Sequence, residues 1–364
     1  MRYEGLSAPV DTDWRGLVDT ILRRRTPSRV YHMELFQDAE IRDAVAERFG
    51  LTDDLDPNDP HYEKRKYIAV QRFCGLDYVR VALDDLSFPL INATTEDTAG
   101  LRRSGGRAYR DEHVGPIRNR ADFETFPWPD VTAPAVTRTL EWYQENLPEE
   151  MCIVSGSMSH FCEYLTWLMG YERFSYALYD DRRLVGDIAD RLVAFHRQAL
   201  ERYLEYDRVK MIFASDDMGF KTGLLFSAEE MTELVLKPHR IIADRTHAAG
   251  LPYLLHSCGN LSAIIDYLID EVKIDGKHSF EDTIEEVREV KHTYGRRTAL
   301  LGGIDVDFLC RSNEDEIRRR VRNTLDVCQP GGGYCLGTGN SVTNYIPLDN
   351  YLAMVDEGRL YGRR

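Results

Sequence analysis

The sequence lacks an excess of positive charge. Across 364 residues, 46 Lys and Arg residues stand against 61 Asp and Glu residues, which gives a formal net charge of −15. Nucleic acids and anionic membranes both attract proteins through a positive field, so this balance argues against binding to either. The composition is that of a soluble globular protein.

Long apolar runs are also missing. No stretch of about 18 consecutive apolar residues is present to span a bilayer, and residues 1–5 contain no apolar segment of the kind found in signal peptides. We therefore expect a cytoplasmic protein that does not associate with a membrane.

Cysteine is scarce and scattered. The chain has seven cysteines, an odd number, and it is not a small secreted domain, so a disulfide framework is not expected. Most of the thiols are predicted to be reduced. Those predicted to be ordinary core residues are Cys74, Cys152, Cys162, Cys310 and Cys328.

What the sequence does contain is a regular alternation of strand-like and helix-like segments. Apolar runs bounded by turn-forming residues predict strands at 29–36, 77–83, 152–158, 211–215, 251–259, 272–278, 299–305 and 334–338. Eight strands alternating with helices predict an α/β fold, a parallel (β/α)8 TIM barrel. We expect one barrel domain over residues 1–364, with excursions at about 51–66 and 96–130.

The fifth predicted strand ends in His256-Ser257-Cys258-Gly259-Asn260. Side chains two residues apart on a strand point to the same face, so the imidazole of His256 and the thiol of Cys258 are expected to emerge together. Active sites of such barrels lie at the C-terminal ends of the strands, and His and Cys are both zinc ligands. The pair therefore predicts half of a metal site.

Other polar residues stand at predicted strand ends. Asp216 and Asp217 follow the fourth strand, and His278 ends the sixth. We expect acid–base roles for these three, although the two acids are also candidates for orienting substrate or binding metal, and one of them could simply cap a loop. A buried carboxylate needs a partner, which makes the first-strand glutamate a functional candidate. The predicted substrate-binding residues are Glu34, Lys221 and Tyr345.

Several motifs carry a resemblance to a known family. They are Asp77-Tyr78 after Gly75, FPWPD at 126–130, HSCGN at 256–260, LLGGID at 300–305 and YCLGTGNSV at 334–342. With these motifs the chain resembles, over most of its length, the uroporphyrinogen decarboxylase superfamily, which includes cobalamin-dependent methyltransferases. The decarboxylases carry an Arg-rich signature that resembles MRQAGR and binds substrate carboxylates, whereas the first strand here reads YHMELF. The resemblance therefore favours the methyltransferase branch.

The resemblance also implies a zinc site. In the methyltransferases of the superfamily, the zinc ligands follow the pattern His-x-Cys with a further Cys far downstream. His256 and Cys258 match the first half of this pattern. Thr338 aligns with the downstream Cys, and Cys335 lies three residues earlier, so the third ligand stays open. We rank Cys335 first, ahead of Glu34, Asp216, Asp217 and His278.

A corrinoid cofactor is implied as well, carried by another protein. A corrinoid domain would show D-x-H-x-x-G, and the nearest string, residues 111–115, has a different spacing. The leading hypothesis is a zinc-dependent methyltransferase, such as an O-demethylase, that moves a methyl group between a small methylated compound or a thiol and a separate corrinoid protein.

Two alternatives to the methyltransferase stay open. One is a metal-independent decarboxylase or lyase in which Asp216, Asp217 and His278 act as acid–base groups. The other is a non-catalytic barrel that binds a corrinoid or tetrapyrrole. The sequence also leaves the oligomeric state open, a homo-oligomer included.

Overall fold

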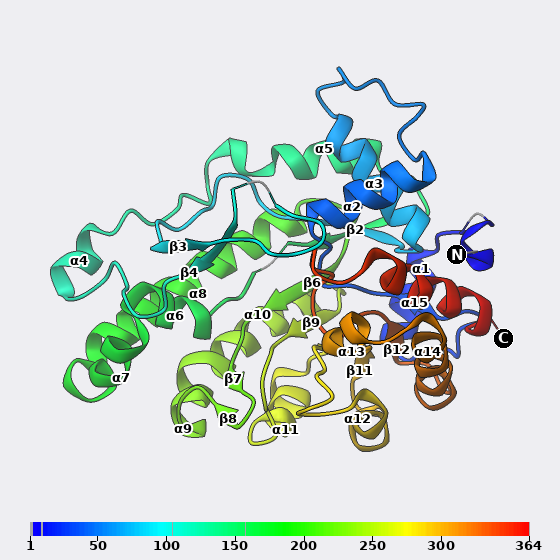
Figure 1. Cartoon of the computed structure of the whole chain (residues 1–364). Helices are drawn as coiled ribbons and strands as arrows, with labels where there is room; N and C mark the ends of the chain where they lie inside the picture. Colours follow the sequence, from blue (N-terminus) through cyan, green and yellow to red (C-terminus); the bar gives the residue numbers. More distant parts are fainter. Residues whose placement is uncertain (1–2, 9, 104, 157, 364) are drawn as a thin grey trace.

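The computed structural model describes residues 3–8, 10–103, 105–156 and 158–363. Eight parallel strands form one curled sheet in the order β1-β12-β11-β10-β9-β6-β5-β2, the sheet of a (β/α)8 TIM barrel (Figure 1). The strands are β1 (Tyr31–His32), β2 (Tyr78–Val81), β5 (Cys152–Ser155), β6 (Val209–Ser215), β9 (Tyr253–His256), β10 (Gly276–His278), β11 (Ala299–Leu301) and β12 (Tyr334–Leu336). Every one coincides with a predicted strand, so the predicted fold is confirmed.

Six residues of the predicted segments cannot be compared with the structure. Ser157, predicted to belong to the third strand, and Ser104, in the predicted excursion at 96–130, lie outside the described residues. The same holds for Met1, Arg2, Pro9 and Arg364 of the predicted domain.

Helices surround the sheet (Figure 1). The α-helices are α1 (Trp14–Ile21), α2 (Ala39–Phe49), α3 (Tyr62–Cys74), α4 (Arg120–Thr125), α5 (Arg138–Asn146), α6 (Cys162–Met169), α7 (Tyr171–Asp180), α8 (Arg182–Leu204), α9 (Ala228–Met231), α10 (Lys237–Ala248), α11 (Ile265–Tyr267), α12 (Val287–Tyr294), α13 (Val306–Arg311), α14 (Glu314–Cys328) and α15 (Leu348–Tyr361). Short 3-10 turns lie at Glu4–Leu6 and Pro134–Thr137, and π-helical turns at Thr232–Leu236 and Leu268–Val272. In the described part of the chain, no helix has the length and apolar character needed to cross a membrane.

The strands separate two apolar layers because successive side chains point to opposite faces. Along β6, Met211 and Phe213 belong to one buried cluster, whereas Ile212 and Ala214 belong to the other. The central strands are therefore buried on both faces, as expected for a parallel sheet covered by helices.

Side chains close the barrel between its first two strands. Among the described residues, no backbone hydrogen bond joins β1 to β2, which stand at the two ends of the strand order. The Tyr78 hydroxyl accepts a hydrogen bond from the Glu34 amide at 2.9 Å and donates one to the Glu34 carbonyl at 2.8 Å. Arg80, two residues further along β2, donates to the Leu35 carbonyl. These bonds take the place of a strand ladder.

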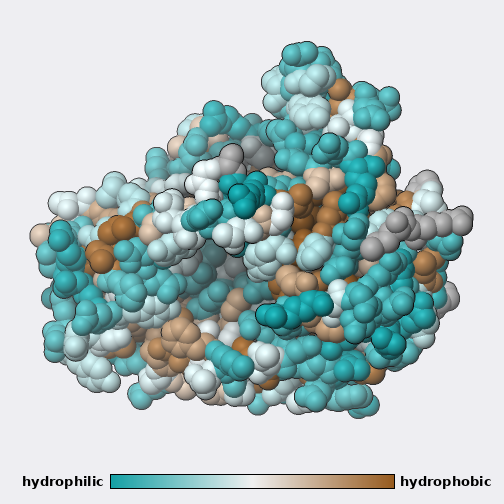
Figure 2. All heavy atoms as spheres, in the orientation of Figure 1, coloured by the Kyte–Doolittle hydropathy of each residue, from teal (hydrophilic) through white to brown (hydrophobic). Residues whose placement is uncertain are grey.

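Two small hairpins interrupt the barrel pattern. β3 (Asn92–Thr95) pairs antiparallel with β4 (Arg107–Arg110), and β4 lies within the excursion predicted at 96–130. β7 (Gly219–Phe220) and β8 (Gly223–Leu224) form a second hairpin directly after β6, which the sequence did not predict. In Figure 2 the visible surface is mostly hydrophilic, with a hollow below the β3–β4 hairpin.

Candidate metal centre

Three neighbouring strands bring the candidate residues to one edge of the barrel. His256, the last residue of β9, is in register with Ser215 on β6 and with His278 on β10. The segments that follow these strands therefore start side by side. Asp217 lies two residues beyond Ser215, and Cys258 lies two residues beyond His256.

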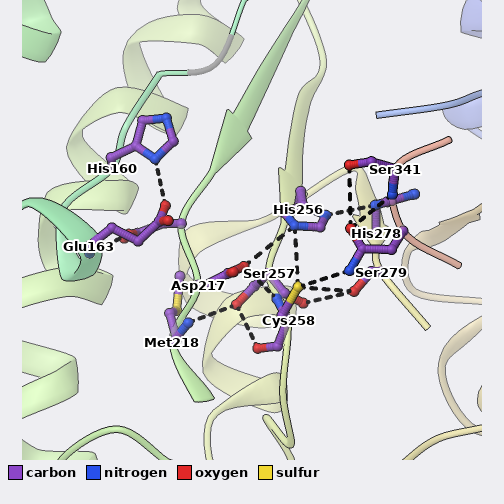
Figure 3. A network of polar contacts seen from close by, with 12 residues as sticks. His160, Glu163, Asp217, Met218, His256, Ser257, Cys258, His278, Ser279 and Ser341 are labelled. Carbon is purple, nitrogen blue, oxygen red and sulfur yellow. Dashed lines mark hydrogen bonds and ion pairs between the residues drawn. The ribbon is translucent and has the colours of Figure 1, made fainter. Parts of the chain in front are cut away.

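The side chains of Asp217, His256 and Cys258 converge on one point (Figure 3). One donor atom from each lies within 4.8 Å of the other two. The His256 Nε2 atom is 3.5 Å from the Cys258 Sγ and 3.4 Å from the Asp217 Oδ1. Nitrogen, sulfur and carboxylate oxygen are the donors that zinc binds in proteins.

The spacing of these atoms suits a tetrahedral ion. With the bond lengths that zinc prefers, ideal tetrahedral angles place nitrogen and sulfur ligands about 3.6 Å apart and nitrogen and oxygen ligands about 3.3 Å apart. The observed separations, 3.5 Å and 3.4 Å, agree with these values. If an ion is bound, three protein donors would leave its fourth position open, as in a catalytic rather than a structural zinc site.

His278 orients the imidazole of His256. The two Nδ1 atoms lie 2.7 Å apart, so one of them donates a hydrogen bond to the other. Burial, reinforced by the charges of His256 and Lys277, lowers the pKa of His278 well below its ordinary value, so this ring is neutral. A neutral His278 can accept the Nδ1 proton of His256, which leaves the His256 Nε2 free to bind a cation.

Two polar side chains contact the Cys258 sulfur. The Asn340 Nδ2 donates to it at 3.2 Å, and the Ser279 hydroxyl lies 3.8 Å away. Such contacts hold the sulfur in one orientation, as the partners of metal-ligating side chains do. The Cys258 amide also donates to the Asp217 Oδ1 at 2.8 Å, which fixes that carboxylate beside the sulfur.

The charges of the three donors are arranged for a cation. Burial opposes ionisation of Asp217, but hydrogen bonds from His256 and Cys258 lower its pKa to about 2. Burial also opposes protonation of His256, but the neighbouring Cys258 and Asp217 raise its pKa to about 10. The site therefore attracts positive charge, here a proton, and a divalent cation would compete with that proton.

Comparison with known proteins places this barrel in a family. The sequence profile named uroporphyrinogen decarboxylase (URO-D) matches residues 112–361. The chain belongs to the uroporphyrinogen decarboxylase family. It is 24% identical to a uroporphyrinogen decarboxylase of Cupriavidus necator over 297 residues, which cover 74% of this chain and 77% of that protein. A methyltransferase from Methanosarcina mazei has the same fold, with a TM-score of 0.63, 17% identity, and coverage of 94% of this chain and 97% of that one.

In this member of the uroporphyrinogen decarboxylase family, Cys335 lies away from the His256–Cys258 pair. Its thiol is fully buried in the core, and burial raises its pKa. The pKa of Cys335 responds to the charges of Asp77, Arg29 and Lys291. Arg29 precedes β1 and Asp77 precedes β2, so both lie at the N-terminal ends of the strands, opposite the candidate metal centre. The ranking of third ligands is corrected accordingly, because Asp217 reaches the pair and Cys335 does not.

Asp216 points away from the converging donors. Its carboxylate accepts hydrogen bonds from the amides of Phe161, Cys162 and Glu163, at 3.0, 2.9 and 3.0 Å, at the start of α6. The His239 Nε2 on α10 lies 3.0 Å from the same carboxylate. Because these contacts occupy both oxygens, Asp216 positions α6 relative to β6, and the acid–base role expected for it is not supported by its surroundings.

The three predicted substrate-binding residues are dispersed. Glu34 is buried, and its carboxylate accepts from the Thr338 amide at 3.0 Å and the Thr338 hydroxyl at 2.6 Å. Lys221 is exposed between β7 and β8. Tyr345 borders a cavity of about 920 Å³ that Asn340, a contact of Cys258, also lines.

Sequence reasoning missed Asn340 and a dyad formed by His160 and Glu163. Asn340 lies within the quoted motif YCLGTGNSV, yet nothing in that string indicates which side chain reaches Cys258. The His160 Nδ1 and the Glu163 Oε2 are 2.6 Å apart (Figure 3). Their spacing of three residues was the available signal, but His160 precedes α6, which begins at Cys162, so helical spacing alone does not predict the contact.

Proposed function

We propose that this chain is a zinc-dependent methyltransferase that exchanges a methyl group with a separate corrinoid protein. The observation that carries the proposal is the convergence of Asp217, His256 and Cys258 at zinc-like spacing on the barrel edge where such folds place active sites. The likeness in fold to a Methanosarcina mazei methyltransferase is consistent with it.

The proposed roles follow from the contacts. Asp217, His256 and Cys258 would hold zinc, which when bound supplies Lewis acidity toward the oxygen, nitrogen or sulfur atom that loses or receives the methyl group. A methyl group that moves as a cation equivalent leaves its electron pair on that atom. His278 keeps the His256 Nε2 turned toward the site, and Asn340 and Ser279 hold the Cys258 sulfur by hydrogen bonds.

The cytoplasmic location and the separate corrinoid partner belong to this proposal. A corrinoid held by another protein has to reach the strand ends from outside, so the barrel mouth must admit it. The proposed site is open to solvent at Asp217, whose side chain is 42% exposed, whereas the side chain of His256 is 6% exposed.

A decarboxylase is the second candidate, since the Cupriavidus necator relative carries that name. Two features weigh against it. The YHMELF strand stands where decarboxylases carry their Arg-rich signature, and the Asp216 carboxylate is already bound by three amides and His239. A metal-independent decarboxylase would keep its turnover after chelation, which separates the two candidates.

Metal analysis tests the proposal. Protein purified without chelator should contain about one zinc per chain, as expected for a single three-ligand site. A His256→Ala Cys258→Ala double variant should lose the zinc, and Cys335→Ser, the matched control, should keep it. The zinc-loaded wild type should transfer methyl groups between a donor panel and free cobalamin. Zinc-free protein with undiminished turnover, or zinc retained by the double variant, would overturn the proposal.

A further inference from the structure

One part-buried cation in the barrel has a buried nitrogen that makes no hydrogen bond to the described residues. Arg80 on β2 donates from its Nε to the Ser155 carbonyl at 3.3 Å and from its Nη1 to the Leu35 carbonyl. Its Nη2 atom is buried and has no hydrogen-bond partner among the described residues. A guanidinium carries two N–H donors on that nitrogen.

The charge of Arg80 is also uncompensated. Within the described ranges, no carboxylate lies at ion-pair distance from it, and the groups that act on it most are Tyr78, Tyr67 and Tyr203. Burial lowers the pKa of the guanidinium, which nevertheless stays protonated in proteins. The Phe213 ring, 4.7 Å from its central carbon, offers partial compensation. An unpaired buried charge is costly, so an anion at this point would stabilise the folded protein.

Arg80 lines a cavity of about 390 Å³. Ala82 and Gly156, which follow β2 and β5, border it at the C-terminal edge of the sheet, and Tyr67 and Tyr143 border it from the surrounding helices. The other charged residues of its lining do not neutralise Arg80. Lys66 is paired with Asp43 and Glu63 at 2.8 Å, and Arg42 donates to the Gln37 carbonyl.

One aromatic ring is close to both Arg80 and the candidate metal centre. Phe213 on β6 contacts the guanidinium on one side, and its ring centroid is 6.1 Å from that of His278. His278 in turn bonds to His256, a candidate metal ligand. Phe213 and His278 therefore connect Arg80 to the candidate metal ligand His256 through consecutive side-chain contacts inside the barrel.

We propose that Arg80 binds a carboxylate group of the substrate, so that the methylated compound or its demethylated product is a small carboxylic acid. The claim that the ligand is a carboxylate depends on the unpartnered Nη2 atom and the cavity that Arg80 lines. The claim that this ligand carries or loses a methyl group rests on the function proposed above. Only one nitrogen of Arg80 is free, which suits a carboxylate monoanion better than a phosphate dianion.

Calorimetric titration tests this site. The probes are acetate and benzoate, their neutral isosteres acetamide and benzamide, and inorganic phosphate. We expect the two carboxylates to bind the wild type more tightly than their amides do. Arg80→Met should weaken carboxylate binding about tenfold or more, because a charge-assisted hydrogen bond is lost. Arg80→Lys should retain part of the affinity, and Arg197→Met, which changes an exposed arginine on α8, should retain all of it.

Three results would overturn the inference. They are carboxylates that bind no better than the amides, carboxylate binding that is equal in Arg80→Met, and phosphate that binds more tightly than both carboxylates. Thermal unfolding and circular dichroism of each variant identify a folding failure, because Arg80 also joins β1 to β5. If Arg80→Met does not fold, the comparison of Arg80→Lys with wild type, and of acids with amides, decides the question.

The titrations use both chelated and zinc-loaded protein, which separates this inference from the proposed function. Carboxylate binding at Arg80 that survives chelation, in a protein whose zinc-loaded form transfers no methyl group, would leave the anion site standing and reject the methyltransferase. Methyl transfer that is unaffected by Arg80→Met would reject the anion site alone.

Discussion

At the scale of single residues, the burial of Glu34 changes its pKa enough to affect how stability depends on pH. Burial raises its pKa to about 8, against the opposing hydrogen bonds from Thr338, whereas an exposed glutamate titrates near pH 4.5. The folded protein therefore holds this proton where the unfolded chain has lost it. Stability from this group is fully present below about pH 4.5 and is lost as the pH rises through about 8.

Replacing Glu34 should change that pH dependence. Urea unfolding of the wild type should show a free energy of unfolding that falls between about pH 5 and pH 8. In Glu34→Gln the fall should be smaller, because the glutamine does not titrate. An unchanged slope would show that the Glu34 carboxyl is not held in its neutral form.

Sequence reasoning predicted that the side chains of His256 and Cys258 emerge together, and their Nε2 and Sγ atoms do lie 3.5 Å apart, although β9 ends at His256 and Cys258 belongs to the segment that follows. The third donor could not be ranked that way. Cys335 and Thr338 differ by an odd number of positions, so strand register already counted against Cys335, and its burial at the other end of the barrel depends on the whole fold. Asp217 was among the alternatives, but its reach toward Cys258 is set by a turn after β6.

At the scale of elements, Asp216 ties a helix to a strand. It accepts three amide hydrogen bonds at the start of α6 and contacts His239 on α10. Which of two adjacent acids makes such contacts cannot be read from the sequence, since His239 arrives from a helix 23 residues away.

Removing that carboxylate should destabilise the protein without removing the metal. Asp216→Ala leaves buried amides and His239 unsatisfied, so we expect the free energy of unfolding to fall by about 3 kcal/mol. Asp216→Asn, which keeps one acceptor oxygen, should lose less. Urea denaturation measures both, and zinc content should stay at the wild-type level. Loss of zinc with unchanged stability would assign Asp216 to the metal site instead.

At the scale of the whole molecule, the eight-strand barrel followed from the sequence because buried parallel strands are short apolar runs bounded by Gly, Asp and Ser. The closure between β1 and β2 did not follow. It depends on side-chain bonds from Tyr78 and Arg80 to backbone groups of another strand, and no local pattern encodes such bonds. The β7–β8 hairpin escaped prediction because its strands have two residues each.

The central claim concerns what the barrel holds at its strand ends. X-ray absorption spectroscopy of the zinc-loaded protein counts the sulfur and the nitrogen or oxygen ligands of the ion directly. The account predicts one sulfur, from Cys258, at about 2.3 Å, together with nitrogen and oxygen ligands at about 2.0–2.2 Å. The Cys258→Ser variant should show no sulfur. Two sulfur ligands in the wild type, or a sulfur signal that persists in Cys258→Ser, would contradict the site formed by Asp217, His256 and Cys258.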